Sequence, residues 1–146
     1  MNRRQFLAAT TVLGLGIETG LVRAARSAEM PIRMRALYNK DGSFSDLAQS
    51  LEGQRITVDG FMAPPLKADI RFFVLTKKPL AVCPFCETEA EWPEDILAIY
   101  TKRSIEVVSY TRKILTRGLL ELGAFQDPDT GFASRVRLTD AVYERA

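Results

Sequence analysis

The sequence of 146 residues contains no histidine. Histidine is the side chain that most often acts as a general base near neutral pH, and it is the commonest metal ligand. Its absence excludes Ser-His-Asp and Cys-His catalytic sites and the usual His-rich catalytic zinc sites. We therefore expect a protein that is not an enzyme.

The sequence also has little net charge, formally +2. Residues 1–27 hold four of the 20 basic side chains and one of the 18 acidic ones, so the remaining 119 residues carry 16 basic and 17 acidic side chains. A nearly neutral remainder gives no electrostatic reason to expect binding to nucleic acid or to an anionic membrane. Beyond residue 27, no apolar run approaches the ~20 residues that a membrane-spanning helix needs.

The first 27 residues have the order of an export signal: basic, then apolar, then small residues at a cleavable end. Arg3 and Arg4, followed by Phe6 and Leu7, resemble the twin-arginine type of bacterial signal, which a receptor reads. The resemblance implies the twin-arginine translocase as a partner during export, export in the folded state, and a periplasmic location. Because Glu18 interrupts the apolar stretch, we expect cleavage and no stable membrane span.

The rest of the chain is expected to form an arm and one domain. Residues 28–43 have mixed charge and a turn signal, and we predict a flexible mature N-terminal arm. Residues 44–146 are enough for a single domain with one hydrophobic core. The domain begins with a predicted helix of about two turns, capped by Ser43 or Ser45 and ended by Gly53.

From residue 54 the hydrophobic period becomes two, which predicts five or six short strands. Short alternating strands with glycines at their bends favour a mainly β fold, a small OB-like, partly closed barrel, because closure removes exposed sheet edges. A turn is predicted over residues 127–131. The expected strands are 54–62, 70–76, 96–100, 112–123, 134–138 and 141–143, with 105–108 as an extension or an edge.

Residues 51–143 are similar to an uncharacterised family of small exported bacterial proteins. The similar segments are Val58–Pro64 (Val-Asp-Gly-Phe-Met-Ala-Pro), Phe73–Leu75, the cysteine loop and Gly118–Gly123 (Gly-Leu-Leu-Glu-Leu-Gly). Some members of that family are associated with transporter systems. The resemblance therefore implies an OB-like fold, an exported protein and an envelope transporter component as a partner.

The two cysteines of the chain stand in one motif, Cys83–Cys86 (Cys-Pro-Phe-Cys). Two thiolates are half of a tetrahedral zinc site, which Glu87 or another nearby carboxylate, water or a second subunit would complete. Soft cuprous copper needs fewer ligands, and Met62 could join the two thiolates if its strand end lies beside the loop. The leading hypothesis is an accessory protein that binds copper or zinc through Cys83 and Cys86 and acts with an envelope or transport partner.

Two other interpretations of the motif stay open. In the oxidising periplasm Cys83 and Cys86 could form a local disulfide in a non-catalytic module that binds a partner. They could also exchange thiols as a redox factor. Redox activity fits less well, because the chain lacks a βαβ pattern and the acidic residues after Cys86 would raise the pKa of a nearby thiol.

Overall fold

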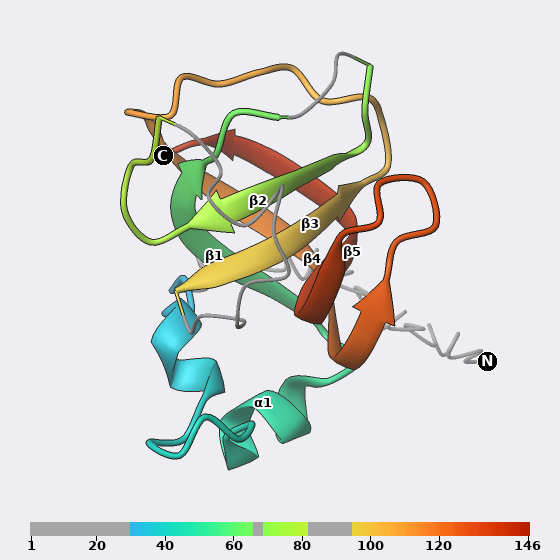
Figure 1. Ribbon diagram of the computed structural model, residues 1–146. Coiled ribbons are helices and arrows are strands. Elements are labelled where there is room, and N and C mark those ends of the chain that lie inside the picture. Colours follow the sequence, from blue (N-terminus) through green and yellow to red (C-terminus); the bar gives the residue numbers. More distant parts are fainter. Residues whose placement is uncertain (1–29, 66–68, 82–94) are drawn as a thin grey trace, which may run out of the picture.

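Five strands close into a barrel in the computed structural model of the chain (Figure 1), which describes residues 30–65, 69–81 and 95–146. The strand order around the barrel is β1-β2-β3-β5-β4. All neighbouring pairs are antiparallel except β3 and β5, which are parallel. This ring confirms the predicted mainly β, OB-like barrel. The elements are η1 (Met34–Leu37), α1 (Asp46–Leu51), β1 (Arg55–Met62), β2 (Phe72–Thr76), β3 (Ile96–Thr101), β4 (Lys113–Gln126) and β5 (Ala133–Arg145).

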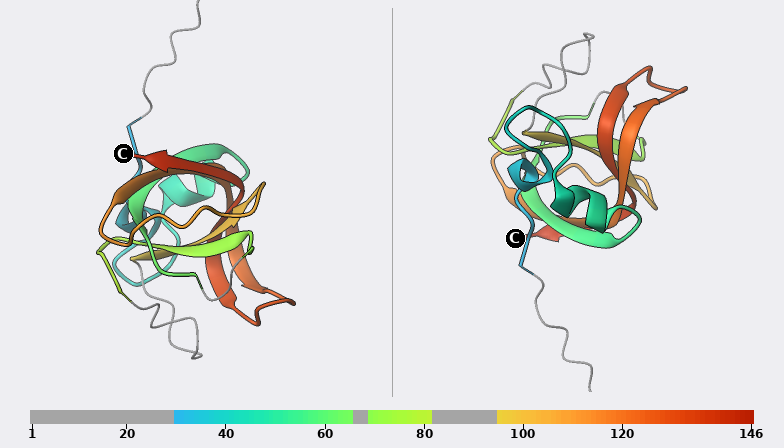
Figure 2. Two further views of the ribbon diagram at one scale, coloured as in Figure 1. Left: turned by 90° about the horizontal axis from the view of Figure 1, so that it is seen from above. Right: turned by 90° about the horizontal axis from the view of Figure 1, so that it is seen from below.

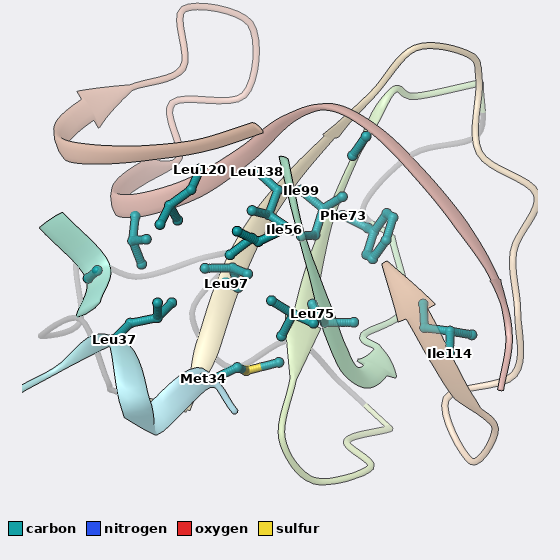
Figure 3. Close-up of a cluster of buried hydrophobic side chains, with 14 of the residues drawn as sticks. Met34, Leu37, Ile56, Phe73, Leu75, Leu97, Ile99, Ile114, Leu120 and Leu138 are labelled. Atoms are coloured by element: carbon teal, nitrogen blue, oxygen red, sulfur yellow. The ribbon is translucent and has the colours of Figure 1, made fainter. Parts of the chain in front are cut away.

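The alternation of the sequence becomes the inside and outside of the barrel. In β1 every second residue from Ile56 to Met62 is buried, and β4 alternates in the same way from Ile114 to Leu120. Their side chains meet those of β2, β3 and β5 in one apolar core (Figure 3). Burying such side chains is the main favourable term in folding. The largest fully buried side chains include Phe73, Leu75, Leu97, Ile99, Ile114, Leu120 and Leu138.

The short helices cover one end of the barrel, as both figures show (Figure 1, and from below in Figure 2). Ser45 caps α1 by accepting a hydrogen bond from the Ala48 N–H at 3.1 Å. Gly53 follows the helix with φ of +75°, and its N–H donates to the Leu120 carbonyl of β4 at 2.8 Å. The predicted helix is confirmed, with Ser45 as its cap, and it is six residues long.

The N-terminal residues before α1 are packed, which differs from the flexible arm expected over residues 28–43. Met34 and Leu37 of η1 are buried, and Figure 3 shows both side chains directed into the core. The Ile32 N–H also donates to the Thr57 carbonyl at 2.8 Å, beside β1. Residues 30–43 therefore close one end of the barrel.

Two predicted strands have different boundaries. The strands expected at 134–138 and 141–143 are one strand, β5, which bends at Asp140 (φ +50°). Opposite this bend the pairing of β5 shifts between Arg117 and Leu119, as at a β-bulge. β5 pairs with both β3 and β4, and its pairing continues on either side of the bend.

Residues 105–108 form no strand. Ile105 and Val108 instead pack against the core from a segment without regular secondary structure. The Ile105 N–H donates to the carbonyl of Ile70, outside the sheet ladders. Within the described ranges, no helix is long and apolar enough to cross a membrane.

Candidate functional site: the β2–β3 connection

The cysteine motif lies in the connection between β2 and β3. Cys83, Cys86 and Glu87 fall outside the residues that the structure describes, as do the signal residues Arg3, Arg4, Phe6 and Leu7. The two ends of the connection, 77–81 and Asp95, are described. In the described part of the chain, no three His, Cys, Asp or Glu side chains are grouped so that they could hold a metal ion.

The two ends of the connection are joined at the barrel. The Lys77 N–H donates a hydrogen bond to the Asp95 carbonyl at 2.9 Å, directly after the Thr76–Ile96 pair of β2 and β3. Thr76 is 2% exposed, and its hydroxyl donates to the Lys78 carbonyl at 2.7 Å. The same hydroxyl lies 3.2 Å from the Phe61 carbonyl of β1. The connection that carries the cysteines thus leaves and re-enters the barrel at one fixed point.

Charged side chains surround this point. Among the residues that the structure describes, a hollow of about 400 Å³ is lined by Arg35 from η1, Lys77 and Lys78 after β2, and Asp95 before β3. We call these four residues the cationic hollow. Sequence reasoning missed it, because Arg35 was assigned to a flexible arm and stands 42 positions before Lys77, with no local pattern to link them.

Met62 lies in the core of the barrel. Its side chain is 0% exposed, and its sulfur accepts a hydrogen bond from the Val108 N–H at 3.5 Å. The strand end that carries Met62 does pair with β2, opposite Leu75.

The outer face of β2 and β3 carries a second apolar cluster. Phe72 contacts Tyr100 of β3 and Phe132 of the β4–β5 turn, with 5.1 Å between ring centroids in both pairs. Val74, Ile96 and Ala98 are buried in the same cluster, so β2 is buried on both faces. Strands 2 and 3 form the usual ligand face of OB barrels. Here the β4–β5 turn packs its own Phe132 against that face.

An acid and a phenol stand beside this cluster. Burial raises the pKa of the Tyr100 hydroxyl, and the neighbouring Asp127 carboxylate raises it further. Burial alone would raise the pKa of Asp127. The backbone N–H groups of Thr130 and Asp129 donate to its carboxylate at 2.9 and 2.7 Å, however, and these hydrogen bonds lower the pKa overall. Tyr100 stays neutral and Asp127 stays ionised near pH 7, and the two backbone hydrogen bonds that Asp127 accepts stabilise the turn.

The comparisons with known proteins bear on the fold. No protein-family model matches the chain, and no curated protein is significantly similar to it in sequence. The crystal structure of a DUF3299 family protein from Pseudomonas aeruginosa PAO1 is similar, with a TM-score of 0.52 and 12% sequence identity. The similarity covers 81% of this chain and 96% of that one. The chain is thus similar in fold to a member of an uncharacterised family.

Proposed function

We propose that this protein is a periplasmic accessory protein that binds a soft metal ion, copper or zinc, through Cys83 and Cys86. The observation that carries the proposal is the position of the motif. The Cys-X-X-Cys spacing stands in a single connection whose ends are held together by the Lys77–Asp95 hydrogen bond. Two thiols three positions apart in the sequence suit a shared metal ion.

The donor atoms favour a soft ion. Thiolates bind cuprous copper and zinc well, and two of them are enough for cuprous copper. A zinc ion needs four ligands, so Glu87, water or a second copy of the loop would supply the rest. The proposal does without Met62, because its sulfur is buried and already accepts a hydrogen bond.

The signal residues give the proposal its compartment. The twin-arginine route carries folded proteins, so the protein would enter the periplasm already folded. Cys83 and Cys86 could therefore hold a metal ion before they meet an oxidising environment. The translocase is the partner during export, and an envelope transporter component is the proposed later partner. The protein has no proposed catalytic activity.

Metal titration of variants tests the proposal. The reduced protein without its signal is titrated with cuprous ions, and separately with zinc, against a chromogenic chelator. We expect one tight site, abolished in the Cys83→Ser/Cys86→Ser double variant. Met62→Leu, which conserves volume, is the matched control and should bind as the original protein does. Equal binding by the double variant would refute the proposal.

The rival interpretation, a partner-binding module with a local disulfide, predicts another result. The two cysteines would then oxidise to a disulfide that resists mild reduction, and the reduced protein would bind the ions no more tightly than the double variant. A thiol-redox factor would show a disulfide that exchanges rapidly and a thiol pKa well below ~8.5.

A further inference from the structure

The outer face of the sheet that β1, β4 and β5 form is left open by the rest of the described chain. In β4 the residues that alternate with the buried ones point outward, and they stand beside the outward residues of β1 and β5 in the register of the sheet. The helices cover the end of the barrel, and in the view from above no helix lies outside β5 (Figure 2, left). This face can therefore receive a partner.

Apolar side chains stand at the centre of this face. Leu115 and Leu119 of β4 are partly exposed and belong to neither apolar cluster of the described barrel. Val142, the β5 partner of Arg117, is 50% exposed. Three ion pairs lie around them: Arg55–Asp140 at 2.6 Å, Lys113–Asp59 at 2.7 Å and Arg137–Glu121 at 2.9 Å. An apolar centre within a polar rim is the usual anatomy of a protein–protein interface.

Two charges of opposite sign lie in the same area. Arg117 and Glu144 are both exposed, and they are diagonal neighbours, since Arg117 stands opposite Val142 and Leu115 stands opposite Glu144. Within the described part of the chain, neither side chain makes an ion pair or a hydrogen bond, even with the other, although the charges of the rim are paired. We call Leu115, Arg117, Leu119, Val142 and Glu144 the sheet patch.

We propose that the sheet patch is the interface of a homodimer. A two-fold axis that runs between Arg117 and Glu144, in the plane between two such faces, places Arg117 of each copy against Glu144 of the other. Both charges are then paired twice, and the leucines and Val142 are covered. Burial of the apolar surface stabilises the dimer, and the charges fix its register. A second copy carries the matching charges already, which favours it over an unrelated partner.

Sedimentation equilibrium measures the association of the full chain, expressed with its own signal and kept with a chelator. We expect a reversible equilibrium between monomer and dimer. Arg117→Glu and Glu144→Arg should each weaken the dimer by at least about tenfold, because each variant sets like charges against each other at both contacts. The matched controls, Lys40→Glu and Glu52→Arg, reverse the same charges at exposed positions outside the sheet patch. They should change the affinity by less than about twofold.

Mixing the two patch variants gives the sharpest test. The Arg117→Glu chain carries two acidic groups in the sheet patch, and the Glu144→Arg chain carries two basic groups. Neither variant should dimerise well alone, but each should bind the other with about the affinity of the original dimer. This rescue requires that position 117 of one copy meets position 144 of the other.

Three results would overturn the proposal: a full chain that stays monomeric at every concentration, Arg117→Glu that dimerises like the original protein, or a mixture that stays monomeric. Circular dichroism checks that the variants fold, and Val142→Asp, at a half-exposed position, is a second variant that should disrupt the dimer.

The dimer does not depend on the proposed metal function, because the sheet patch contains no cysteine. The Cys83→Ser/Cys86→Ser variant should dimerise like the original protein while it loses the metal, so the two proposals succeed or fail separately. Loss of the dimer in that variant would indicate a dimer bridged through the cysteines and would also overturn the proposal.

Discussion

Gly60 controls the closure of the barrel next to the candidate site. β1 and β2 share only two paired positions, Phe61 with Thr76 and Met62 with Leu75. A Cβ atom on Gly60 would lie 2.7 Å from the Thr76 carbonyl oxygen, 2.8 Å from Met34 Cε and 2.9 Å from Leu75 Cγ. All three distances are well inside ordinary van der Waals contact. The added methyl group of Gly60→Ala would therefore clash both with η1 and with the end of β2.

The cost follows from the three contacts. Overpacking a core costs ~1–3 kcal/mol. Three simultaneous contacts, one of them with a backbone oxygen, place Gly60→Ala near the upper end of that range. The alanine also lowers the entropy of the unfolded chain, which stabilises the folded state by ~0.4–1 kcal/mol. We expect a net loss of about 2 kcal/mol, which lowers the Tm by roughly 8 °C for a domain of this size.

Urea unfolding followed by circular dichroism measures this loss. A loss of about 2 kcal/mol lowers the midpoint by about 1 M urea when m is ~2 kcal/mol/M. Gly42→Ala is the control, because it has nothing within 4 Å and only its φ of +81° opposes a side chain. Its cost should be about 1 kcal/mol. If Gly60→Ala were as stable as the original protein, the close approach of β1 to β2 and η1 would be refuted.

Two further predictions concern the polar contacts of the barrel. Because folding lowers the pKa of Asp127, its carboxylate contributes stability that is complete above its ordinary pKa of 3.8 and is lost as the pH falls through the lowered value. Asp127→Asn should therefore be less stable than the original protein by about 1 kcal/mol at pH 7. Thermal unfolding at several pH values should show this difference shrinking below pH 4. A stability difference that does not change with pH would contradict this prediction. The Tyr143 hydroxyl accepts from the Glu106 N–H and donates to the Glu106 carbonyl, both at 2.7 Å. Tyr143→Phe should cost about 1 kcal/mol in urea unfolding and increase amide exchange at Glu106, and unchanged exchange would show that the tyrosine does not hold this segment.

Local patterns in the sequence were enough to predict much of the barrel. The period of two in β1 and β4 predicted which residues face the core, because neighbouring positions on a strand point to opposite sides. Ser45 and Gly53 predicted the ends of α1 through their capping chemistry. The turn predicted over residues 127–131 is confirmed, with Asp127 accepting two backbone hydrogen bonds.

The features that sequence reasoning missed depend on distant contacts. An apolar pattern at 105–108 resembles a strand, but its residues pack on the core without a ladder partner. The sequence predicts two strands in place of β5, with a break at Asp140. An aspartate tolerates the left-handed conformation, and the strand pairing continues beyond Asp140. Arg35 joins Lys77 only after η1 has packed on the end of the barrel.

The central claim is that Cys83 and Cys86 hold a metal ion in the periplasm. The most direct measurement is the metal content and free-thiol count of the full chain, expressed with its own signal and purified from the periplasm without added metal. We predict about one copper or zinc ion per two thiols, with both thiols reactive once the protein is unfolded with a chelator present. A metal-free protein with a complete disulfide between Cys83 and Cys86 would contradict the claim.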